Sequence, residues 1–338
     1  MLYVGVDAHS ERSHITVMDE KGKIVKRANV ASNRECVRKA LGAYRQPMKA
    51  VVEASYCWGG MYDWLDEVAD KVVLAHPLKV RAIAEARIKT DKIDSETLAH
   101  LLRADLIPEA YAPSSDVRAR KRVLRQRMFL VRVRTMVKNR MKALLAQHEV
   151  TRPEVSDLFG KKGCEWLSAL ELPSPDGELL KENLALLKVM NERINSTEDL
   201  IARLTEGDAA IGWLVSLPGI GVFLSVLIRY EVDRIDRFPS AKKFAGYTGL
   251  VPSTYASGER MVHGRLTKQG NKWLRWALIE AVTPAVRTSP FLRRHYEAIK
   301  SRRGAKDART STARKLAELV WTIWTEKRCY EERQRHER

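Results

Sequence analysis

The sequence predicts an α/β domain followed by a chain that is almost entirely helical. Short apolar runs rich in Val and Ile alternate with helix-like segments over the first part of the chain. A long basic segment without acidic residues follows, and beyond it apolar residues recur mostly at helical spacing. We therefore expect an α/β domain at residues 1–112, a helical coiled-coil region at 113–206 and a mostly helical domain at 207–338.

The first domain begins with a predicted meander of three strands. Residues 2–6, 14–18 and 23–30 form short β-branched runs, and the last two flank a turn that ends in Lys-Gly. A helix, a strand at 49–52, a Trp-rich helix and a strand at 72–75 come next. A meander followed by strands that are separated by helices is the order of an RNase H-like fold.

Four carboxylates lie where this fold gathers its active-site acids. Asp7 closes the first strand, and Glu53 closes the strand at 49–52. Asp91 and Asp94 share one face of a predicted helix about one turn apart, so their repulsion favours a cation between them. Such acids hold Mg²⁺ or Mn²⁺ for phosphoryl transfer. The alternative is that Asp7 and Glu53 only terminate strands.

The overall charge indicates an anionic partner. The chain has 60 Lys and Arg against 42 Asp and Glu, a formal net charge of +18. Nucleic acid is the expected partner, although charge does not separate DNA from RNA. The four cysteines lie far apart without a C-x-x-C pair, which favours a reducing cytoplasm. No apolar run approaches the ~18 residues of a membrane span, so we expect no membrane association.

The basic charge is concentrated in one predicted helix, residues 117–148, which contains eleven Lys or Arg residues and no acid. This composition favours phosphate contact over an ordinary solvated face. Two heptad runs predict an antiparallel coiled coil within or between chains, or plain helical packing. The first run is Val123, Leu130, Val137 and Leu144, and the second is Leu180, Leu187, Ile194 and Ile201. The predicted nucleic-acid contacts on the basic helix are Arg118, Arg120, Lys121, Arg122, Arg125, Arg132, Lys138, Arg140 and Lys142.

Two features of the C-terminal domain also favour phosphate binding. Residues 217–221, Leu-Pro-Gly-Ile-Gly, resemble the turn of a helix-hairpin-helix, in which Gly219 and Gly221 would bring backbone N–H groups to a phosphate. A simple tight turn is the alternative. Ser257 precedes a glycine in a polar loop with many nearby cations, but a loop serine alone indicates little. Arg260 and Arg265 are candidate phosphate clamps, and Lys268 is a further candidate contact.

These motifs together resemble one family. Asp7, Glu53, Lys-Thr-Asp-x-x-Asp ending at Asp94, Leu-Pro-Gly-Ile-Gly, Ala-Gly-x-x-Gly-Leu-x-Pro and Tyr-x-Ser-Gly occur in this order across nearly the whole chain. The combination resembles the DEDD-type insertion-sequence transposases, which include Piv-like DNA invertases and bridge-RNA-guided recombinases. One departure is Ala54-Ser55-Tyr56, where the family usually continues as Ala-Thr-Gly.

The resemblance implies a mechanism and partners. Asp7, Glu53, Asp91 and Asp94 would be the metal ligands of a RuvC-like domain, and Ser257 the nucleophile of a C-terminal transposase domain that forms a phosphoserine link to DNA. A prokaryotic homodimer or tetramer would act on donor and target DNA with a structured bridge RNA. Alternatives are a junction resolvase-type nuclease in which Ser257 is incidental, an invertase without RNA, and a non-catalytic nucleic-acid-binding protein.

Overall fold

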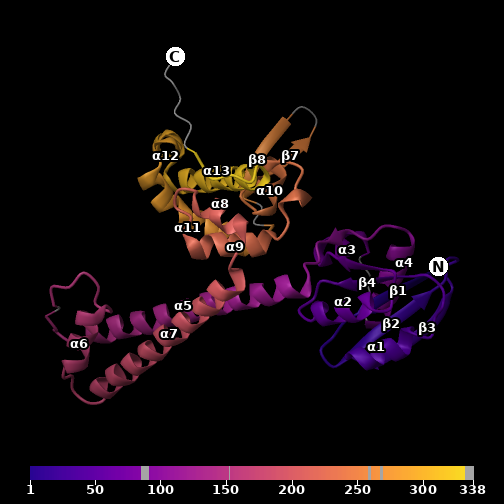
Figure 1. Ribbon diagram of the computed structural model, residues 1–338, viewed down its shortest axis with the longest axis horizontal. Helices are drawn as coiled ribbons and strands as arrows, with labels where there is room; N and C mark the ends of the chain where they lie inside the picture. The colour runs from indigo at the N-terminus through magenta and orange to yellow at the C-terminus, as the bar shows by residue number, and fades with distance from the viewer. Residues whose placement is uncertain (85–90, 152, 258–259, 267–268, 332–338) are drawn as a thin grey trace. The chain divides into compact units, whose positions relative to one another are not determined.

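The computed structural model describes residues 1–84, 91–151, 153–257, 260–266 and 269–331, with side chains outside residues 91–92 and 252–268. The chain forms two compact units, Met1–Ser115 and Asp116–Arg338. The predicted coiled-coil region therefore lies in the same unit as the C-terminal helices (Figure 1). None of the helices in the described part of the chain combines the length and the apolar character that a membrane-spanning helix requires.

The first unit contains a six-stranded sheet in the order β3-β2-β1-β4-β5-β6. β1, β2 and β3 form the predicted antiparallel meander, and β4 and β5 follow in parallel with β1. This arrangement is consistent with an RNase H-like domain. The sixth strand, β6, was not predicted; it has two residues and pairs antiparallel with β5. The strands are β1 (Leu2–Asp7), β2 (Arg12–Met18), β3 (Ile24–Ala31), β4 (Met48–Glu53), β5 (Lys71–Ala75) and β6 (Glu109–Ala110).

Helices cover both faces of this sheet. α1 (Arg34–Leu41) and α2 (Trp58–Asp66) contribute Val37, Leu41, Met61 and Leu65 to a core with Val4 and Val6 of β1. α3 (Pro77–Ile83) and α4 (Asp91–Arg103) pack on the other face, where Val80, Leu98 and Leu102 meet Val51 and Val73. Because strand side chains alternate between faces, each strand divides its residues between these two cores.

The second unit begins with two long helices, α5 (Ser115–Leu145) and α7 (Asp176–Thr205), which lie side by side (Figure 1). Arg127 bonds Glu198 and Arg134 donates to Asn191, so the two helices run antiparallel. Beyond the end of α5, His148 lies 2.8 Å from Asp176, the first residue of α7. α6 (Lys161–Ala169) closes one end, where Leu167 packs with Met141 and Leu180.

The other end of this pair enters a helical core. Val117, Leu124 and Ile201 pack there with the C-terminal helices. A hairpin of β7 (Pro252–Ser257) and β8 (Arg260–Leu266) interrupts these helices. The helices are α8 (Ala209–Val215), α9 (Val222–Val232), the short 3₁₀ helix η1 (Ile235–Arg237), α10 (Ala241–Tyr247), α11 (Lys272–Thr288), α12 (Pro290–Arg303) and α13 (Ala305–Thr325).

Candidate active site

Asp7 and Glu53 stand at the ends of adjacent parallel strands. Val6 of β1 pairs with Val52 of β4, so the two acids that follow lie level with each other. Val4, Val6 and Val52 belong to the core beneath α1 and α2, whereas Val51 belongs to the core beneath α3 and α4. By the alternation of strand residues, Asp7 and Glu53 therefore project onto the face that α4 covers.

The direction of α4 brings its first turn to the same end of the sheet. The last residue of α4, Arg103, donates to the carbonyl of Glu20 in the turn between β2 and β3. That turn lies beside the start of β1, because Tyr3 pairs with Met18. α4 thus runs antiparallel to β1, and its first turn, with half-buried Asp94, lies toward the end of the strand. Asp91 is the first residue of α4, and its side chain lies outside the described residues.

The surroundings of Asp7 are polar and partly open. Its side chain is 19% exposed, and its Oδ2 lies 3.1 Å from Nε2 of His9. The Cys57 thiol donates to the carbonyl of Ala8 at 3.2 Å. Carboxylate oxygens with an open side suit Mg²⁺ or Mn²⁺, which retain water among their ligands. Among the side chains that the structure describes, no three metal-ligating groups form a site on their own. The four-acid site, which includes the undescribed side chain of Asp91, stays a prediction.

Ser257 occupies a strand end. We expected a loop here, but Ser257 is the last residue of β7 and pairs with Arg260, the first residue of β8. Thr254-Tyr255-Ala256 has strand character that the surrounding glycines obscured. The side chains of Ser257, Arg260 and Arg265 lie outside the described side chains, and Lys268 lies outside the described residues. Ser257 belongs to the second unit and the four acids to the first.

A buried acid that we did not predict lies close to the base of this hairpin. Glu231 of α9 is 1% exposed and accepts hydrogen bonds from the Arg125 guanidinium, at 2.8 and 3.2 Å. Its other oxygen accepts from Nδ2 of Asn271 at 2.8 Å and lies 3.8 Å from Nζ of Lys121. Burial lowers the pKa of Lys121, and Glu231 partly offsets that effect. A single acid in the apolar run of α9 was the available signal, since buried charges require partners.

Asn271 connects this cluster to the hairpin. It caps α11 by accepting from the N–H groups of Trp273 and Leu274, at 2.9 and 3.2 Å. Its own N–H donates to the carbonyl of Tyr247, at the end of α10. The hairpin leaves and rejoins the core between these two helices. Glu231, Asn271 and Lys121 therefore fix the part of the core from which the Ser257 strand projects.

The predicted nucleic-acid contacts of α5 fall into two groups. Arg120, Lys121 and Arg125 bond to groups inside the protein, and Lys138 and Lys142 lie 5.0 and 5.7 Å from the ring centre of Phe159. Arg118 is half-buried and has partners of its own. The remaining cations are exposed; they are Arg122, Arg132 and Arg140. Lys142 and Arg125 are exposed as well, despite their contacts.

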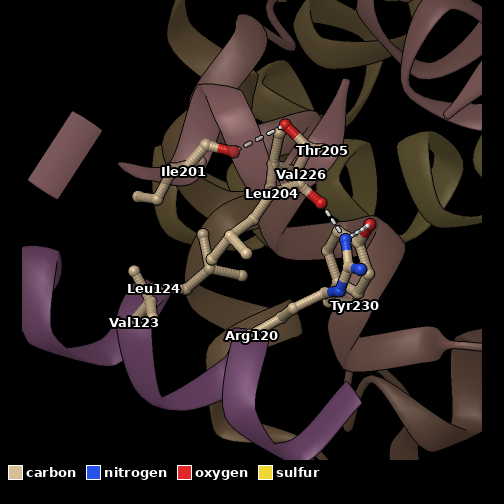
Figure 2. A pocket seen from close by; sticks show the side chains of 8 residues that line it. All are labelled: Arg120, Val123, Leu124, Ile201, Leu204, Thr205, Val226 and Tyr230. Carbon is tan, nitrogen blue, oxygen red and sulfur yellow. Dashed lines mark hydrogen bonds between the residues drawn. The ribbon is translucent and has the colours of Figure 1, made fainter. Parts of the chain in front are cut away.

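Figure 2 shows why Arg120 is structural. Its guanidinium donates to the carbonyl of Leu204 and, at 3.0 Å, to the hydroxyl of Tyr230, which joins α5, α7 and α9. The pocket between these helices is lined by Val123, Leu124, Ile201, Leu204, Thr205 and Val226 together with Arg120 and Tyr230, and has room for about one water molecule. It is a packing gap rather than a substrate site.

Gly219 and Gly221 have different environments. Gly219 has a φ of 79°, and a methyl group there would come within 2.7 Å of the Ala285 nitrogen and closer still to the Ala281 carbonyl. Gly221 caps α9 with an ordinary extended backbone and open space around it. The turn joins α8 to α9, an order that a helix-hairpin-helix and a simple tight turn share, so the helix-hairpin-helix stays a prediction. Packing against α11 explains Gly219, whereas the space beside Gly221 is open, and phosphate contact there stays a prediction.

Two family models match the chain. One, described as the transposase IS116/IS110/IS902 family, matches residues 213–297, which contain both glycines and Ser257. The other, a DEDD transposase model of IS110 type, matches residues 4–149, which contain the four acids and α5. The two matches together span more than half of the chain.

Several similar bacterial proteins are named as transposases. The chain is 27% identical over 299 residues to a probable family 20 transposase of Pseudomonas aeruginosa. The aligned region covers 85% of this chain and 87% of the relative. The chain is 24% identical over 348 residues to the transposase for insertion sequence element IS1111A of Coxiella burnetii, an alignment that covers 97% of this chain and 90% of that relative. The transposase for element IS1328 of Yersinia enterocolitica is 23% identical over 289 residues, with coverages of 82% and 84%.

Proposed function

Because the chain belongs to the DEDD-type transposases of IS110-like insertion sequences, we propose that it cuts and rejoins DNA through a phosphoserine intermediate. Asp7, Glu53, Asp91 and Asp94 are the proposed metal ligands, and Ser257 is the proposed nucleophile. The observation that carries the proposal is the meeting of three elements on one face of the sheet: the ends of β1 and β4 and the first turn of α4.

The chemistry assigns each residue one task. The Ser257 hydroxyl oxygen bonds to the scissile phosphorus, its proton passes to a base or solvent, and the DNA oxygen leaves with the electron pair of the broken P–O bond. One phosphodiester replaces another, so the reverse step rejoins DNA without ATP. The four acids would hold a divalent metal, whose charge would stabilise the phosphate and favour the ionised form of the attacking oxygen. Arg260 and Arg265 would balance the negative charge of the transition state.

The wider assembly is part of the proposal. The first unit would adopt a RuvC-like fold at residues 1–112, α5 and α7 would form a coiled coil within 113–206, and residues 207–338 would carry the serine. A homodimer or tetramer would bring Ser257 of one copy to the acids of another. The exposed cations of α5 and the backbone at Gly221 would hold donor DNA, target DNA or a guiding bridge RNA.

The deciding experiment compares two serines of the same strand. We expect Ser257→Ala to lower the yield of a covalent protein–DNA species at least about 1,000-fold, because no other hydroxyl replaces the nucleophile. Ser253→Ala, in β7 as well, should leave it unchanged. Asp94→Asn should abolish both the covalent species and DNA cutting in Mg²⁺. The covalent species is measured as labelled DNA that stays with the protein in denaturing gels.

Other outcomes would change the assignment. DNA cutting by Ser257→Ala at the wild-type rate, with no covalent species in either protein, would identify a metal-dependent nuclease of the junction resolvase kind. Recombination that persists in Asp94→Asn would contradict the metal site. Nucleic acid that purifies with the protein tests the guide: one defined RNA with two DNA-complementary loops supports guided transposition, whereas recombination by RNA-free protein supports an invertase.

A further inference from the structure

α4 lies against the backbone of β1 at Gly5. A methyl group on Gly5 would lie 2.6 Å from the backbone nitrogen of Ala99 and closer still to the carbonyl oxygen of Ser95. Real Cβ atoms essentially never approach backbone atoms this closely, so any other residue at this position would push the helix away from the strand. Gly5 therefore sets how near α4 lies to the sheet.

Ser95 of α4 is also bonded to β2. Thr16 is the direct pairing partner of Gly5, and its Oγ1 shares a hydrogen bond of 2.9 Å with Oγ of Ser95. Both hydroxyl groups belong to buried residues, each 1% exposed. A slide of the helix would break this bond and leave the buried Thr16 hydroxyl without it, at a cost of about 1–3 kcal/mol. Apolar contacts of Leu98 and Leu102 tolerate such a slide better, because they are not directional.

This contact lies just below the proposed metal site. From Gly5 to Asp7 the strand rises by about 6.6 Å, and from Ser95 back to Asp91 the helix covers about 6 Å in the same direction. With Ser95 seated on Gly5, the first residue of α4 is therefore level with the end of β1. A shift of α4 by one turn would displace Asp91 and Asp94 from the strand ends by about 5.4 Å.

We propose that Gly5, Thr16 and Ser95 form a positioning clamp that holds the α4 acids in register with Asp7 and Glu53. The clamp rests on the proposed function of these four acids. Its three residues are positioning residues, since the acids themselves would contact the metal. Two further contacts involve the same helix. Arg27 of β3 bonds Glu96 of α4 at 2.7 Å, and Arg103, in the last turn of α4, donates to the carbonyl of Glu20.

The test measures the affinity of the full chain for Mn²⁺ alone by electron paramagnetic resonance. We expect Thr16→Val and Ser95→Ala each to weaken Mn²⁺ binding about tenfold, and the double variant to be no weaker than either single one, because all three remove the same bond. Thr16→Ser keeps the hydroxyl and should bind as the wild type does. Gly5→Ala should weaken Mn²⁺ binding further, and circular dichroism checks that it folds.

A matched control separates positioning from stability. Tyr62 of α2 donates to the carbonyl of Val72 at 3.3 Å, on the side of the sheet away from α4. Tyr62→Phe removes one hydrogen bond of the same domain and should lower thermal stability without changing the affinity for Mn²⁺. Equal losses of Mn²⁺ affinity in Tyr62→Phe and Thr16→Val would overturn the clamp, because the effect would then follow stability alone.

Asp7→Asn and Glu53→Gln separate the clamp from the proposed function. If wild-type protein binds Mn²⁺ and both acid variants lose it, the four-acid site is supported. Unchanged affinity in Thr16→Val and Ser95→Ala would then overturn the clamp alone. If the acid variants bind Mn²⁺ as tightly as wild type, the metal site itself is wrong, and the clamp loses its function with it.

Discussion

At the scale of single residues, Glu231 has the most consequential environment in the second unit. Its carboxylate is almost completely buried and is bonded by Arg125 and Asn271, with Lys121 nearby. Two cations that the sequence places on a nucleic-acid surface therefore contribute to an internal cluster. The physical reason is that a buried carboxylate without partners would be too costly to desolvate.

We predict that Glu231→Ala lowers the free energy of unfolding of the second unit by about 3–5 kcal/mol, because it leaves Lys121 buried and uncompensated. Urea denaturation followed by tryptophan fluorescence measures this loss, since Trp273 lies 5.5 Å from the Arg125 guanidinium. Glu198→Ala is the control. It also removes a carboxylate bonded by an arginine of α5, but Glu198 is 45% exposed, so the loss should be at most about 1 kcal/mol. Equal losses in the two variants would contradict the special role of Glu231.

At the scale of elements, the turn between α8 and α9 contains two glycines with separable tasks. Gly219 lies against Ala281 and Ala285, in the last two turns of α11. Gly221 lies in open space at the first turn of α9. The sequence shows two equivalent glycines, and only the packing of α11 distinguishes them.

We predict that Gly219→Ala destabilises the second unit by about 2 kcal/mol or more, since it combines a disfavoured positive φ with a backbone clash. Gly221→Ala should change stability by at most about 1 kcal/mol. If a phosphate approaches the N-terminus of α9, Gly221→Ala should nevertheless weaken DNA binding, measured by fluorescence anisotropy. Weaker stability in Gly221→Ala than in Gly219→Ala would refute this division of roles.

The α5–α7 pair shows how an element can differ from its sequence pattern. We predicted a seam through Val123, Leu130, Val137 and Leu144, but of these only Leu130 is buried. Leu124, Met141 and Leu145 are buried instead, and arginines such as Arg127 and Arg134 occupy the intervening seam positions. The guanidinium groups of these two arginines bond to Glu198 and Asn191 of α7, so part of the seam consists of polar contacts and has no apolar pattern in the sequence. In α7, all four predicted heptad residues are buried.

At the scale of the whole molecule, the excess of positive charge predicts a salt-dependent partner. We predict that replacing Arg122, Arg132, Arg140 and Lys142 by Gln reduces the salt dependence of DNA or RNA affinity by about one unit of log–log slope for each phosphate that these side chains neutralise. Binding isotherms between low and moderate salt measure the slope. The control replaces four exposed cations of α7 by Gln, which changes the net charge equally. They are Lys181, Lys188, Arg193 and Arg203. An equal reduction for both sets would show that net charge, rather than the α5 surface, determines binding.

The sequence by itself determined the meander, the parallel strands β4 and β5, the acids at two strand ends and the family. These features depend on periodicity and local motifs, which are written along the chain. It did not determine the strand at Ser257, the internal bonding of Lys121 and Arg125, or the seating of Ser95 on Gly5 and Thr16. The strand at Ser257 pairs with β8 only a few residues away, but its strand character is obscured by the surrounding glycines. The other two features are contacts between residues tens of positions apart or more, and only the packing of helices on the sheet and on one another decides which side chains share a buried space.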